Sequence, residues 1–399
     1  MNTPAHQITL DVNRLQKMLD DILAYWMRET IDEKNGGFIG QIDAQENKNW
    51  QADKGSVLHA RILYTFSEAY QLTGNTKYLY VAEWAYRYIE TNFYHKNGIY
   101  WSVTATGVPS ERKNQIYALA FTIYGCASYY AVSKNAQALA MANDLLMKIE
   151  KYSFDSEYNG YFEAFTENWK PLSDFRLSDK DVNEKKTMNT HLHIVEAYAN
   201  LYKVAPSAYL KERIQNLLDV IEEHFINKKQ WHLNLFFSET WTETKSVISF
   251  GHDIEAAWLL LWCAEQINDE NYIERYREIA VGLAKACFKG VDSDGGLWYE
   301  FDLNENKLIR EKHWWPQAEF WLGMHCAYNL TNDEKFLNAV IENLAFTEKY
   351  ILDRENGEWL WGILEDKSKM NEDKVGIWKC PYHNGRACME LIKILKENK

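Results

Sequence analysis

The sequence predicts an all-α protein, an (α/α)6 barrel of twelve helices with β-hairpins at one end, formed by a single domain over residues 1–399. Three observations predict this fold. Proline occurs 6 times and glycine 19 times among 399 residues, which disfavours a turn-rich sandwich or β-barrel. Aromatic-rich turns recur along the chain. The segments between these turns carry the apolar periodicity of helices.

The repeated unit is a turn followed by alternating aromatic residues. Six such segments occur at intervals of 61 to 71 residues and fill the chain. They lie at residues 32–38, 97–101, 155–162, 229–237, 292–299 and 353–361. A turn flanked by alternating aromatic residues is typical of a β-hairpin. We therefore expect each unit to be a helix, a hairpin and a second helix.

The two helices of a unit differ in their apolar pattern. The helix before a hairpin is amphipathic, as in residues 12–27 and 272–287, and is expected to face solvent. The helix after it is apolar on nearly all sides, as in residues 256–264, and is expected to be buried. Six buried helices inside a ring of six exposed ones satisfy both patterns. An open α-solenoid is the alternative arrangement.

Composition and charge narrow the range of partners and locations. The net charge is -13 and basic residues do not cluster with aromatic ones, so a nucleic-acid partner is disfavoured. Residues 114–133 are uncharged but contain polar side chains and four tyrosines, which favours a buried helix over a membrane span. The six cysteines form no CxxC pair and the first eleven residues lack a leader pattern, so we expect a cytoplasmic protein with reduced thiols. We also expect a monomer.

Polar residues collect where the apolar inner helices begin, and a buried helix needs a reason to carry them there. The hairpins join each outer helix to the next inner helix at the same end of the barrel. All six helix starts should therefore line one aromatic-walled pocket. The candidate residues at these starts are Arg61, Tyr117, Asn189, His193, His252, Glu255, Trp315, Glu319, Trp378 and His383.

The histidines in these segments have alternative interpretations. His191 and His193 form an HxH pair, but rings at i and i+2 on a helix point to different sides, which disfavours a metal site. His252 and Glu255 are three residues apart on one helical face. The carboxylate should therefore hold the imidazole and favour its protonated form, unless the pair is purely structural.

The carboxylates and aromatic residues also leave alternatives open. Glu255, Glu319 and Asp253 are candidate acids and bases of a glycoside hydrolase, which needs two carboxylates flanking the scissile bond. Arg61 is either an anion stabiliser or the buried partner of a core carboxylate. The tryptophans at the helix starts are either core residues or platforms on which a sugar stacks. The sequence lacks GxG, GK and GxSxG motifs, so nucleotide cofactors have no usual support.

Four stretches together resemble signatures of the N-acylglucosamine 2-epimerase superfamily, and within it those of the cellobiose 2-epimerases. They are residues 177–193, 251–255 (Gly-His-Asp-Ile-Glu), 313–319 (His-Trp-Trp-Pro-Gln-Ala-Glu) and 378–383 (Trp-Lys-Cys-Pro-Tyr-His). The resemblance covers essentially the whole chain. It implies an (α/α)6 barrel that inverts C2 of a reducing-end sugar without a metal or a nucleotide cofactor. N-acylglucosamine epimerases and mannose isomerases share this scaffold.

The resemblance also implies a substrate and residue roles. The substrate is expected to be an oligosaccharide, cellobiose in the first place, with lactose and mannobiose as related candidates. His252 and His383 would be the acid/base pair, with Glu255 orienting His252. Arg61 and His193 would assist at the sugar oxygens. The residues expected to hold the sugar are Trp315, Trp378, Tyr117, Asn189, Asp181 and Glu319.

Inversion at C2 explains why histidines would be needed. Ring opening exposes the C1 aldehyde, a base then takes the C2 proton, and a proton returns to the planar enediolate from the opposite face. His252 and His383 lie on the fourth and sixth inner helices, a placement that fits two sides of one pocket. Trp298 and Trp361 are candidates to line a cleft for a second sugar unit. A non-catalytic carbohydrate-binding protein is a further alternative, since aromatic walls alone suffice for binding.

Overall fold

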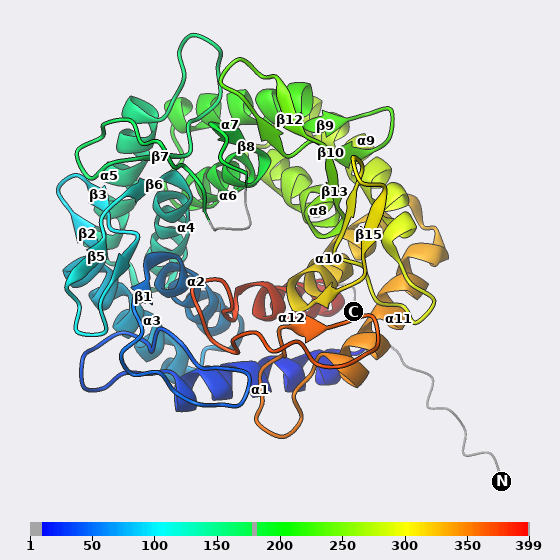
Figure 1. Cartoon of the computed structure of the whole chain (residues 1–399), viewed down its shortest axis with the longest axis horizontal. Helices are drawn as coiled ribbons and strands as arrows, with labels where there is room; N and C mark the ends of the chain where they lie inside the picture. Colours follow the sequence, from blue (N-terminus) through cyan, green and yellow to red (C-terminus); the bar gives the residue numbers. More distant parts are fainter. Residues whose placement is uncertain (1–9, 178–181, 398–399) are drawn as a thin grey trace.

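The computed structural model describes residues 10–177 and 182–397, and within them twelve α-helices form two concentric rings (Figure 1). The inner helices are α2 (Ser56–Thr73), α4 (Ile116–Ser133), α6 (Met188–Val204), α8 (Phe250–Gln266), α10 (Trp314–Thr331) and α12 (Tyr382–Glu397). The outer helices are α1 (Val12–Glu29), α3 (Thr76–Tyr88), α5 (Ala136–Tyr152), α7 (Ala208–Val220), α9 (Glu270–Cys287) and α11 (Glu334–Tyr350). Each inner helix contacts the next, and α12 contacts α2 again, so the ring is closed. The predicted (α/α)6 barrel is confirmed and the open solenoid is excluded.

The two rings follow from the two apolar patterns. Helix α1 buries a stripe that includes Leu15, Leu19, Ile22 and Trp26 and packs this stripe against α12. Helix α4, in contrast, is buried continuously from residue 116 to residue 129, because neighbours surround it on all sides. The amphipathic helices are therefore the outer ones, as predicted.

Short connections join the first five inner helices to the outer helices that follow them, at one end of the barrel. Helix α2 ends at Gly74, whose positive φ of 69° closes the helix, and the Asn75 side chain then caps α3 by accepting the N–H of Lys77. Asn332 and Asp333 repeat this arrangement between α10 and α11. The six long connections, which carry the strands, consequently all lie at the opposite end.

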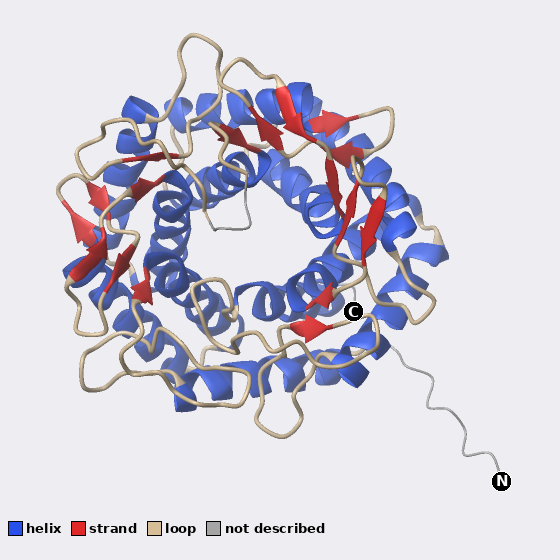
Figure 2. Cartoon of the chain, in the orientation of Figure 1, coloured by secondary structure: helices blue, strands red, loops and turns tan. Residues whose placement is uncertain are grey.

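The long connections contain short antiparallel strands that surround the mouth of the barrel (Figure 2). Three irregular helical turns, Ile89–Phe93, Ile221–Phe225 and Phe288–Gly290, precede some of these strands. The strands are β1 (Lys54–Gly55), β2 (Tyr94–His95), β3 (Gly98–Ile99), β4 (Ser102–Val103), β5 (Pro109–Glu111), β6 (Asn114–Gln115), β7 (Ala164–Phe165), β8 (Lys186–Thr187), β9 (Ile226–Asn227), β10 (His232–Leu233), β11 (Phe236–Phe237), β12 (Glu243–Lys245), β13 (Val247–Ser249), β14 (Glu300–Asp302), β15 (Lys307–Ile309), β16 (Lys312–His313) and β17 (Gly362–Ile363).

The pairing of these strands differs from the expected set of self-contained hairpins. Compact hairpins do occur, as between β2 and β3 or between β9 and β10. The strand that leads into an inner helix, however, pairs with a strand of the following connection, as β1 does with β4 and β8 with β11. This cross-unit pairing satisfies backbone groups at the helix starts and ties neighbouring units together at the mouth.

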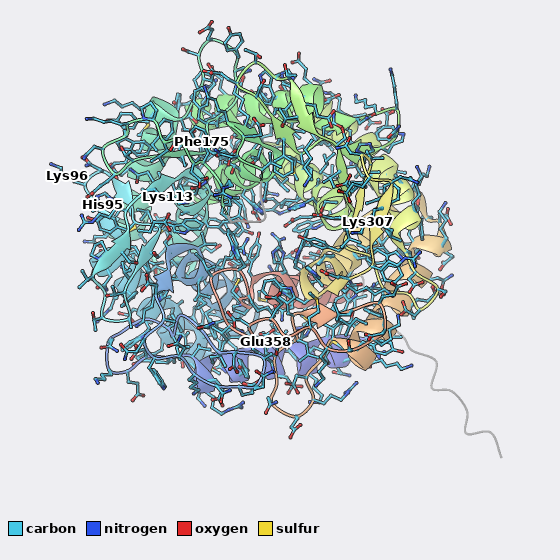
Figure 3. The ribbon with its side chains drawn as sticks, in the orientation of Figure 1. His95, Lys96, Lys113, Phe175, Lys307 and Glu358 are labelled. Atoms are coloured by element: carbon cyan, nitrogen blue, oxygen red, sulfur yellow. The ribbon has the colours of Figure 1, made fainter. Side chains whose placement is uncertain are left out.

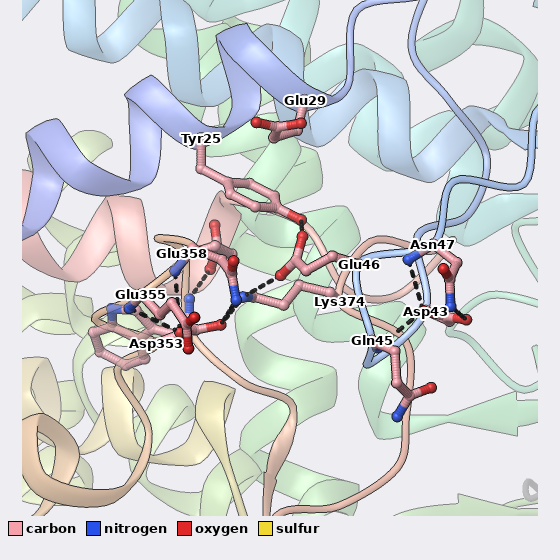
Figure 4. A network of polar contacts seen from close by, with 12 residues as sticks. Tyr25, Glu29, Asp43, Gln45, Glu46, Asn47, Asp353, Glu355, Glu358 and Lys374 are labelled. Atoms are coloured by element: carbon pink, nitrogen blue, oxygen red, sulfur yellow. Dashed lines mark hydrogen bonds and ion pairs between the residues drawn. The ribbon is translucent and has the colours of Figure 1, made fainter.

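The first and last connections close the barrel through a polar network (Figure 4). The Lys374 ammonium, almost fully buried, donates to Glu46 Oε1 at 2.7 Å and to Asp353. Glu46 Oε2 accepts from the Tyr25 hydroxyl at 2.7 Å, and an antiparallel bridge pairs Ile42 with Val375. Helix α1 and the two ends of the repeat series are thereby fixed to one another.

Helix α4 is the one described helix that is long and apolar enough to cross a membrane. Of its 18-residue window, 78% is buried inside the barrel. The apolar composition is therefore explained by its position in the inner ring, as the polar residues within it predicted.

The inner helices approach one another closely at glycines, and this predicts a stability effect. A Cβ on Gly125 would lie 2.6 Å from the backbone oxygen of Ala60 on α2. We expect Gly125→Ala to lower the free energy of unfolding by about 1–3 kcal/mol, because overpacking outweighs the gain in helix propensity. Gly376→Ala is the matched control, since its nearest neighbour would be 3.7 Å away. Urea unfolding measures both; equal midpoints for wild type and Gly125→Ala would contradict the expectation.

Candidate active site

Side chains from the starts of the inner helices meet at the strand-bearing end of the barrel. The clearest contact is that of the Trp315 indole on α10, whose centroid lies 4.8 Å from the His252 ring and 5.6 Å from the His383 ring. The two imidazoles are therefore separated by no more than the sum of these distances. They come from α8 and α12, on either side of α10, so the predicted convergence of the two histidines is present.

The two imidazoles have different hydrogen-bond partners. His252 Nδ1 lies 2.8 Å from the Ser249 hydroxyl, and His383 Nδ1 lies 2.6 Å from Glu319 Oε1. In both rings the Nε2 atom makes no hydrogen bond to another group of the described residues. Each histidine is thus oriented through one nitrogen while the other nitrogen is available to a ligand.

Burial determines the protonation of these rings. It lowers the pKa of His252 to about 3, and the nearby His193 and His383 add to this effect. Burial also lowers the pKa of His383 to about 3, although the Glu319 carboxylate opposes it. Both imidazoles are consequently neutral at neutral pH in the free protein.

This depression of pKa is testable by imidazole NMR. Because an ordinary histidine has a pKa near 6.5 and burial disfavours the cation, we expect His252 and His383 to remain neutral at pH 5, with protonation midpoints well below 6. His191, fully buried and hydrogen-bonded to backbone, serves as an internal reference with the same expected behaviour. A midpoint at or above 6 for either His252 or His383 would contradict the expectation.

A second histidine–carboxylate pair lies on α6. His193 Nδ1 is 2.7 Å from Glu196 Oε2, one helical turn further along. The His193 ring meets the Tyr117 ring edge-on at 5.0 Å, and the Tyr117 hydroxyl accepts a 2.7 Å hydrogen bond from Arg61 Nη2. Arg61, His193 and Tyr117 are therefore brought together as predicted.

Arg61 is a buried cation held by aromatic rings. Its guanidinium carbon lies 4.2 Å from the centroid of Phe121 and 4.9 Å from that of Tyr382. It forms no ion pair with a carboxylate of the described residues, and its Nε has no hydrogen-bond partner there. The interpretation as partner of a core carboxylate is thus not supported, and the positive charge remains available to an anion.

Aromatic and amide groups complete the wall of the site. Trp378, in the connection before α12, lies 5.8 Å from Trp101 and 5.9 Å from Tyr117, centroid to centroid. The Oδ1 atom of Asn189 is buried without a hydrogen-bond partner among the described residues. A buried acceptor of this kind is satisfied when a ligand hydroxyl donates to it.

Asp181, the remaining predicted contact, lies outside the described residues. Residues 175–176, which precede the gap in the description, are hydrogen-bonded to residues 113–115, which lead into α4; Phe175 and Lys113 are labelled in Figure 3. Gln115 Nε2 donates to the Phe175 carbonyl at 3.0 Å, and Lys113 Nζ donates to the Arg176 carbonyl at 3.1 Å. Residues 175 and 176 therefore lie at the strand-bearing end of the barrel.

Two expected roles are corrected. Glu255 does not hold His252: Glu255 Oε1 accepts from Arg386 Nη2 at 2.9 Å, and His252 is hydrogen-bonded to the Ser249 hydroxyl instead. Glu319 is fully buried with its oxygens hydrogen-bonded to His383, Arg386 and the Trp258 indole. It is placed to orient a histidine rather than to contact a ligand directly.

The two tryptophans expected to line a second cleft are partly buried and pack against the core. Trp298 covers the buried Lys312 ammonium, which lies 4.0 Å from its ring centroid. Trp361 packs 4.6 Å from Trp314, and its Nε1 is buried. Each ring therefore has contacts with the protein, both side chains remain partly exposed, and their place in a second sugar cleft stays a prediction.

The candidate metal ligands are explained by other contacts. His191 accepts the Tyr161 N–H at Nε2 and faces the Thr187 carbonyl through Nδ1, which is a structural role. Ligand atoms of Glu255, Glu319 and His383 do lie within 4.8 Å of one another. Arg386 Nη2, however, donates to both carboxylates, so a guanidinium already supplies the positive charge between them.

Comparison with known proteins places this site in a family. The sequence pattern of the N-acylglucosamine 2-epimerase (GlcNAc 2-epimerase) family matches residues 37–387. The chain belongs to the N-acylglucosamine 2-epimerase family. It is 42% identical over 374 residues to a cellobiose 2-epimerase of Bacteroides fragilis, covering 93% of this chain and 95% of that protein. A cellobiose 2-epimerase of Ruminococcus albus is 36% identical over 381 residues, or 94% of this chain and 97% of that protein.

Solved structures agree with this assignment. The cellobiose 2-epimerase from Bacillus thermoamylovorans superposes with a TM-score of 0.91 at 38% identity, covering 96% of this chain and 99% of that one. A D-mannose isomerase superposes with a TM-score of 0.84 at 19% identity, covering 98% and 100%, and shares the fold. This epimerase-family protein is therefore an isomerase, a carbohydrate 2-epimerase.

Sequence analysis missed two residues of this epimerase site, Glu196 on α6 and Arg386 on α12. A repeat in the sequence contains a signal for Arg386. Four inner-helix starts carry a buried lysine, and the seventh residue after it lies in the site. The lysines and their partners are Lys54 with Arg61, Lys186 with His193, Lys312 with Glu319, and Lys379 with Arg386.

Proposed function

We propose that this epimerase inverts C2 of the reducing-end glucose of cellobiose and related β-1,4-linked disaccharides, giving the corresponding glucosyl-mannose. The observation that carries the proposal is the Trp315 indole with an imidazole of His252 and of His383 beside it, each with its Nε2 available. An indole face suits the C–H face of a sugar, and two bases beside it suit deprotonation and reprotonation of one carbon. The names of the relatives point to the same disaccharide.

The reaction begins with the open-chain sugar. With the C1 aldehyde exposed, one imidazole takes the C2 proton and leaves an enediolate. The other imidazole delivers a proton to the opposite face. The epimer forms, and the two imidazoles have exchanged protonation states. His193, oriented by Glu196 and in contact with Tyr117, is placed to move protons between sugar oxygens when the ring opens and closes.

One imidazole must already be an imidazolium when the enediolate forms, because it delivers the second proton. Both are neutral in the free protein, and the negative charge of the intermediate favours proton uptake beside it. His383 has a carboxylate partner that stabilises the imidazolium, whereas His252 has only a hydroxyl. We therefore infer that His383 takes up one proton from solvent as the open-chain sugar binds, so that the forward reaction starts with an imidazolium at His383 and a neutral base at His252.

Arg61 is the group that stabilises the enediolate. Its charge is permanent, it is almost fully buried, and its position is fixed by Tyr117 and the ring of Phe121. A donor fixed in advance at a developing oxyanion lowers a barrier by about 3–4 kcal/mol. No carboxylate of the described residues neutralises this charge, so it is fully available to the intermediate.

The deuterium-exchange test described below would also detect related activities on the same scaffold. N-acylglucosamine or mannose 2-epimerisation and aldose–ketose isomerisation use the same enediolate, and the last differs only in the carbon that is reprotonated. The glycoside hydrolase alternative requires Glu255 and Glu319 to act as separate acid and base. Both carboxylates bind one Arg386 nitrogen, which leaves no space for a glycosidic bond between them.

Incubation of cellobiose in deuterated water, followed by NMR, tests the proposal. We expect deuterium at C2 of the reducing-end residue together with appearance of the mannose-type epimer. Lactose, mannobiose, N-acetylglucosamine and mannose in parallel identify the preferred sugar and reveal ketose formation. Release of monosaccharide from cellobiose, or absence of C2 label with every sugar, would overturn the proposal.

A further inference from the structure

Arg386 lies at the centre of the polar groups beneath the site, although it reaches no surface that a sugar could touch. The side chain is 1% exposed. Its Nη1 donates to Glu196 Oε1 at 2.5 Å, and its Nη2 donates to Glu255 Oε1 at 2.9 Å and to Glu319 Oε1 at 2.7 Å. One guanidinium thus binds three carboxylates that come from three different inner helices, α6, α8 and α10.

Two of these carboxylates are the partners of histidines. Glu196 uses its other oxygen to bind His193 Nδ1 at 2.7 Å. Glu319 uses the same oxygen for Arg386 and for His383 Nδ1, at 2.7 and 2.6 Å. Both histidine–carboxylate pairs of the site are therefore joined through Arg386, and a displacement of the guanidinium displaces both.

The charges around Arg386 come from every inner helix packed against it. Helix α6 contributes Glu196, α8 contributes Glu255, α10 contributes Glu319, and α12 itself contributes Tyr382, whose hydroxyl donates to Glu196 at 2.5 Å. Arg386 also acts electrostatically on His193 of α6 and His383 of α12. Further groups that it affects are Tyr64 on α2, Tyr124 on α4 and Cys263 on α8.

The protonation states of the three carboxylates determine the negative charge around Arg386. Burial acts against ionisation of Glu319, but Arg386 and His383 hold its pKa at about 2. Burial likewise acts against ionisation of Glu196, but Arg386 and His193 outweigh it and lower the pKa of Glu196. Burial and the Glu319 charge raise the pKa of Glu255 well above its ordinary value. The Arg386 guanidinium thus faces two carboxylate charges, those of Glu196 and Glu319.

We propose that Arg386 is a positioning residue that holds the His193–Glu196 and His383–Glu319 pairs as one unit and so controls the orientation and protonation of both imidazoles without contacting the sugar. The catalytic meaning of this inference rests on the proposed function. The structural part does not, because it concerns the two histidines of the free protein. A buried carboxylate that loses its guanidinium partner must be neutralised, and the nearest group that can supply a proton to it or share one is its histidine.

Two variants separate the charge of Arg386 from its geometry. Arg386→Gln removes the charge, and Arg386→Lys keeps a charge that cannot reach three carboxylates from three helices at once. The matched control is Arg275→Gln, since Arg275 also binds two carboxylates, Asp219 and Glu222, but lies on the outer helix α9.

The measurement is an NMR titration of the imidazoles of the full-length protein, with the C2 exchange rate on cellobiose as a second readout. In Arg386→Gln we expect the midpoints of His193 and His383 to rise by one pH unit or more, a tenfold change in proton affinity, because a positive charge is removed beside each carboxylate partner. In Arg386→Lys we expect smaller shifts in the midpoints, a lower kcat and an unchanged KM. Arg275→Gln should match the wild type in every respect.

Unchanged midpoints of both histidines in Arg386→Gln would overturn the proposal, and so would a fall in thermal stability with kcat retained. If Arg386→Gln does not fold, Arg386→Lys provides the test. Unchanged imidazole resonances together with an unchanged kcat in that variant would also overturn the proposal. Failure of the proposed function is recognised separately, by wild-type protein that exchanges C2 of no sugar. The titration still tests the role of Arg386 in that case.

Discussion

Replacing His252 or His383 by asparagine is expected to abolish epimerisation while leaving half of the exchange chemistry intact. A two-base mechanism needs both imidazoles for inversion, but one is enough to take a proton from one face and return it there. Each variant should therefore lose C2 inversion by about 10²–10⁴-fold. Each should still exchange the C2 hydrogen of one epimer with solvent, and the two variants should act on opposite epimers.

The measurement is C2 deuteration of each pure epimer of the disaccharide by each variant. His95→Asn is the control, because His95 stacks on Tyr100 at the outer edge of the barrel and should leave the rate unchanged (Figure 3). Exchange of both epimers by one variant, or undiminished inversion, would remove that histidine from the acid/base pair. Complementary exchange would establish which face each imidazole serves.

The architecture could be predicted from sequence because its cause is local and repeated. Continuous apolar character in helices such as α4 and a single apolar stripe in helices such as α1 leave a double ring as the arrangement that buries both. The helix starts could be recognised as a site for the same reason, since a polar residue such as Arg61 is costly there without a function.

The partners of the site residues could not be predicted in the same way, because they depend on contacts between helices. The i, i+3 spacing is shared by His193 with Glu196 and by His252 with Glu255, yet only the first pair forms. Glu255 instead binds Arg386, 131 residues away in the chain. Nothing local to residues 252–255 contains that information.

The pairing of the strands could not be predicted from the sequence for a related reason. An aromatic-rich turn predicts a hairpin from nearby residues, whereas Lys54 pairs with Val103 and Lys186 with Phe237 in the next connection. The buried lysines explain why. The Lys54 ammonium binds Asp32 of its own turn at 2.8 Å, which fixes the strand at the helix start and leaves its free edge to the neighbouring unit.

Glu319→Gln is expected to produce the largest loss of activity among substitutions that do not remove a group acting on the sugar. The amide keeps the shape of the side chain and can still bind the Trp258 indole and His383. It cannot stabilise a His383 imidazolium, so kcat should fall by about 10²-fold or more. KM should change little, because Glu319 is fully buried.

The fold should survive this change because a neighbouring carboxylate can compensate. The Glu319 charge is one reason that the pKa of Glu255 is raised, so without it Glu255 ionises more readily and supplies Arg386 with a second anion. Loss of a buried ion-pair partner costs about 3–5 kcal/mol when nothing replaces it. Glu319→Gln should therefore cost much less stability, and the double variant Glu255→Gln, Glu319→Gln should approach the full amount.

Glu365→Gln, which alters an exposed ion pair with Arg310, is the control for both the urea unfolding and the rate. Full activity in Glu319→Gln would show that His383 acts without a charged partner, and equal stability of the single and double variants would refute the compensation by Glu255.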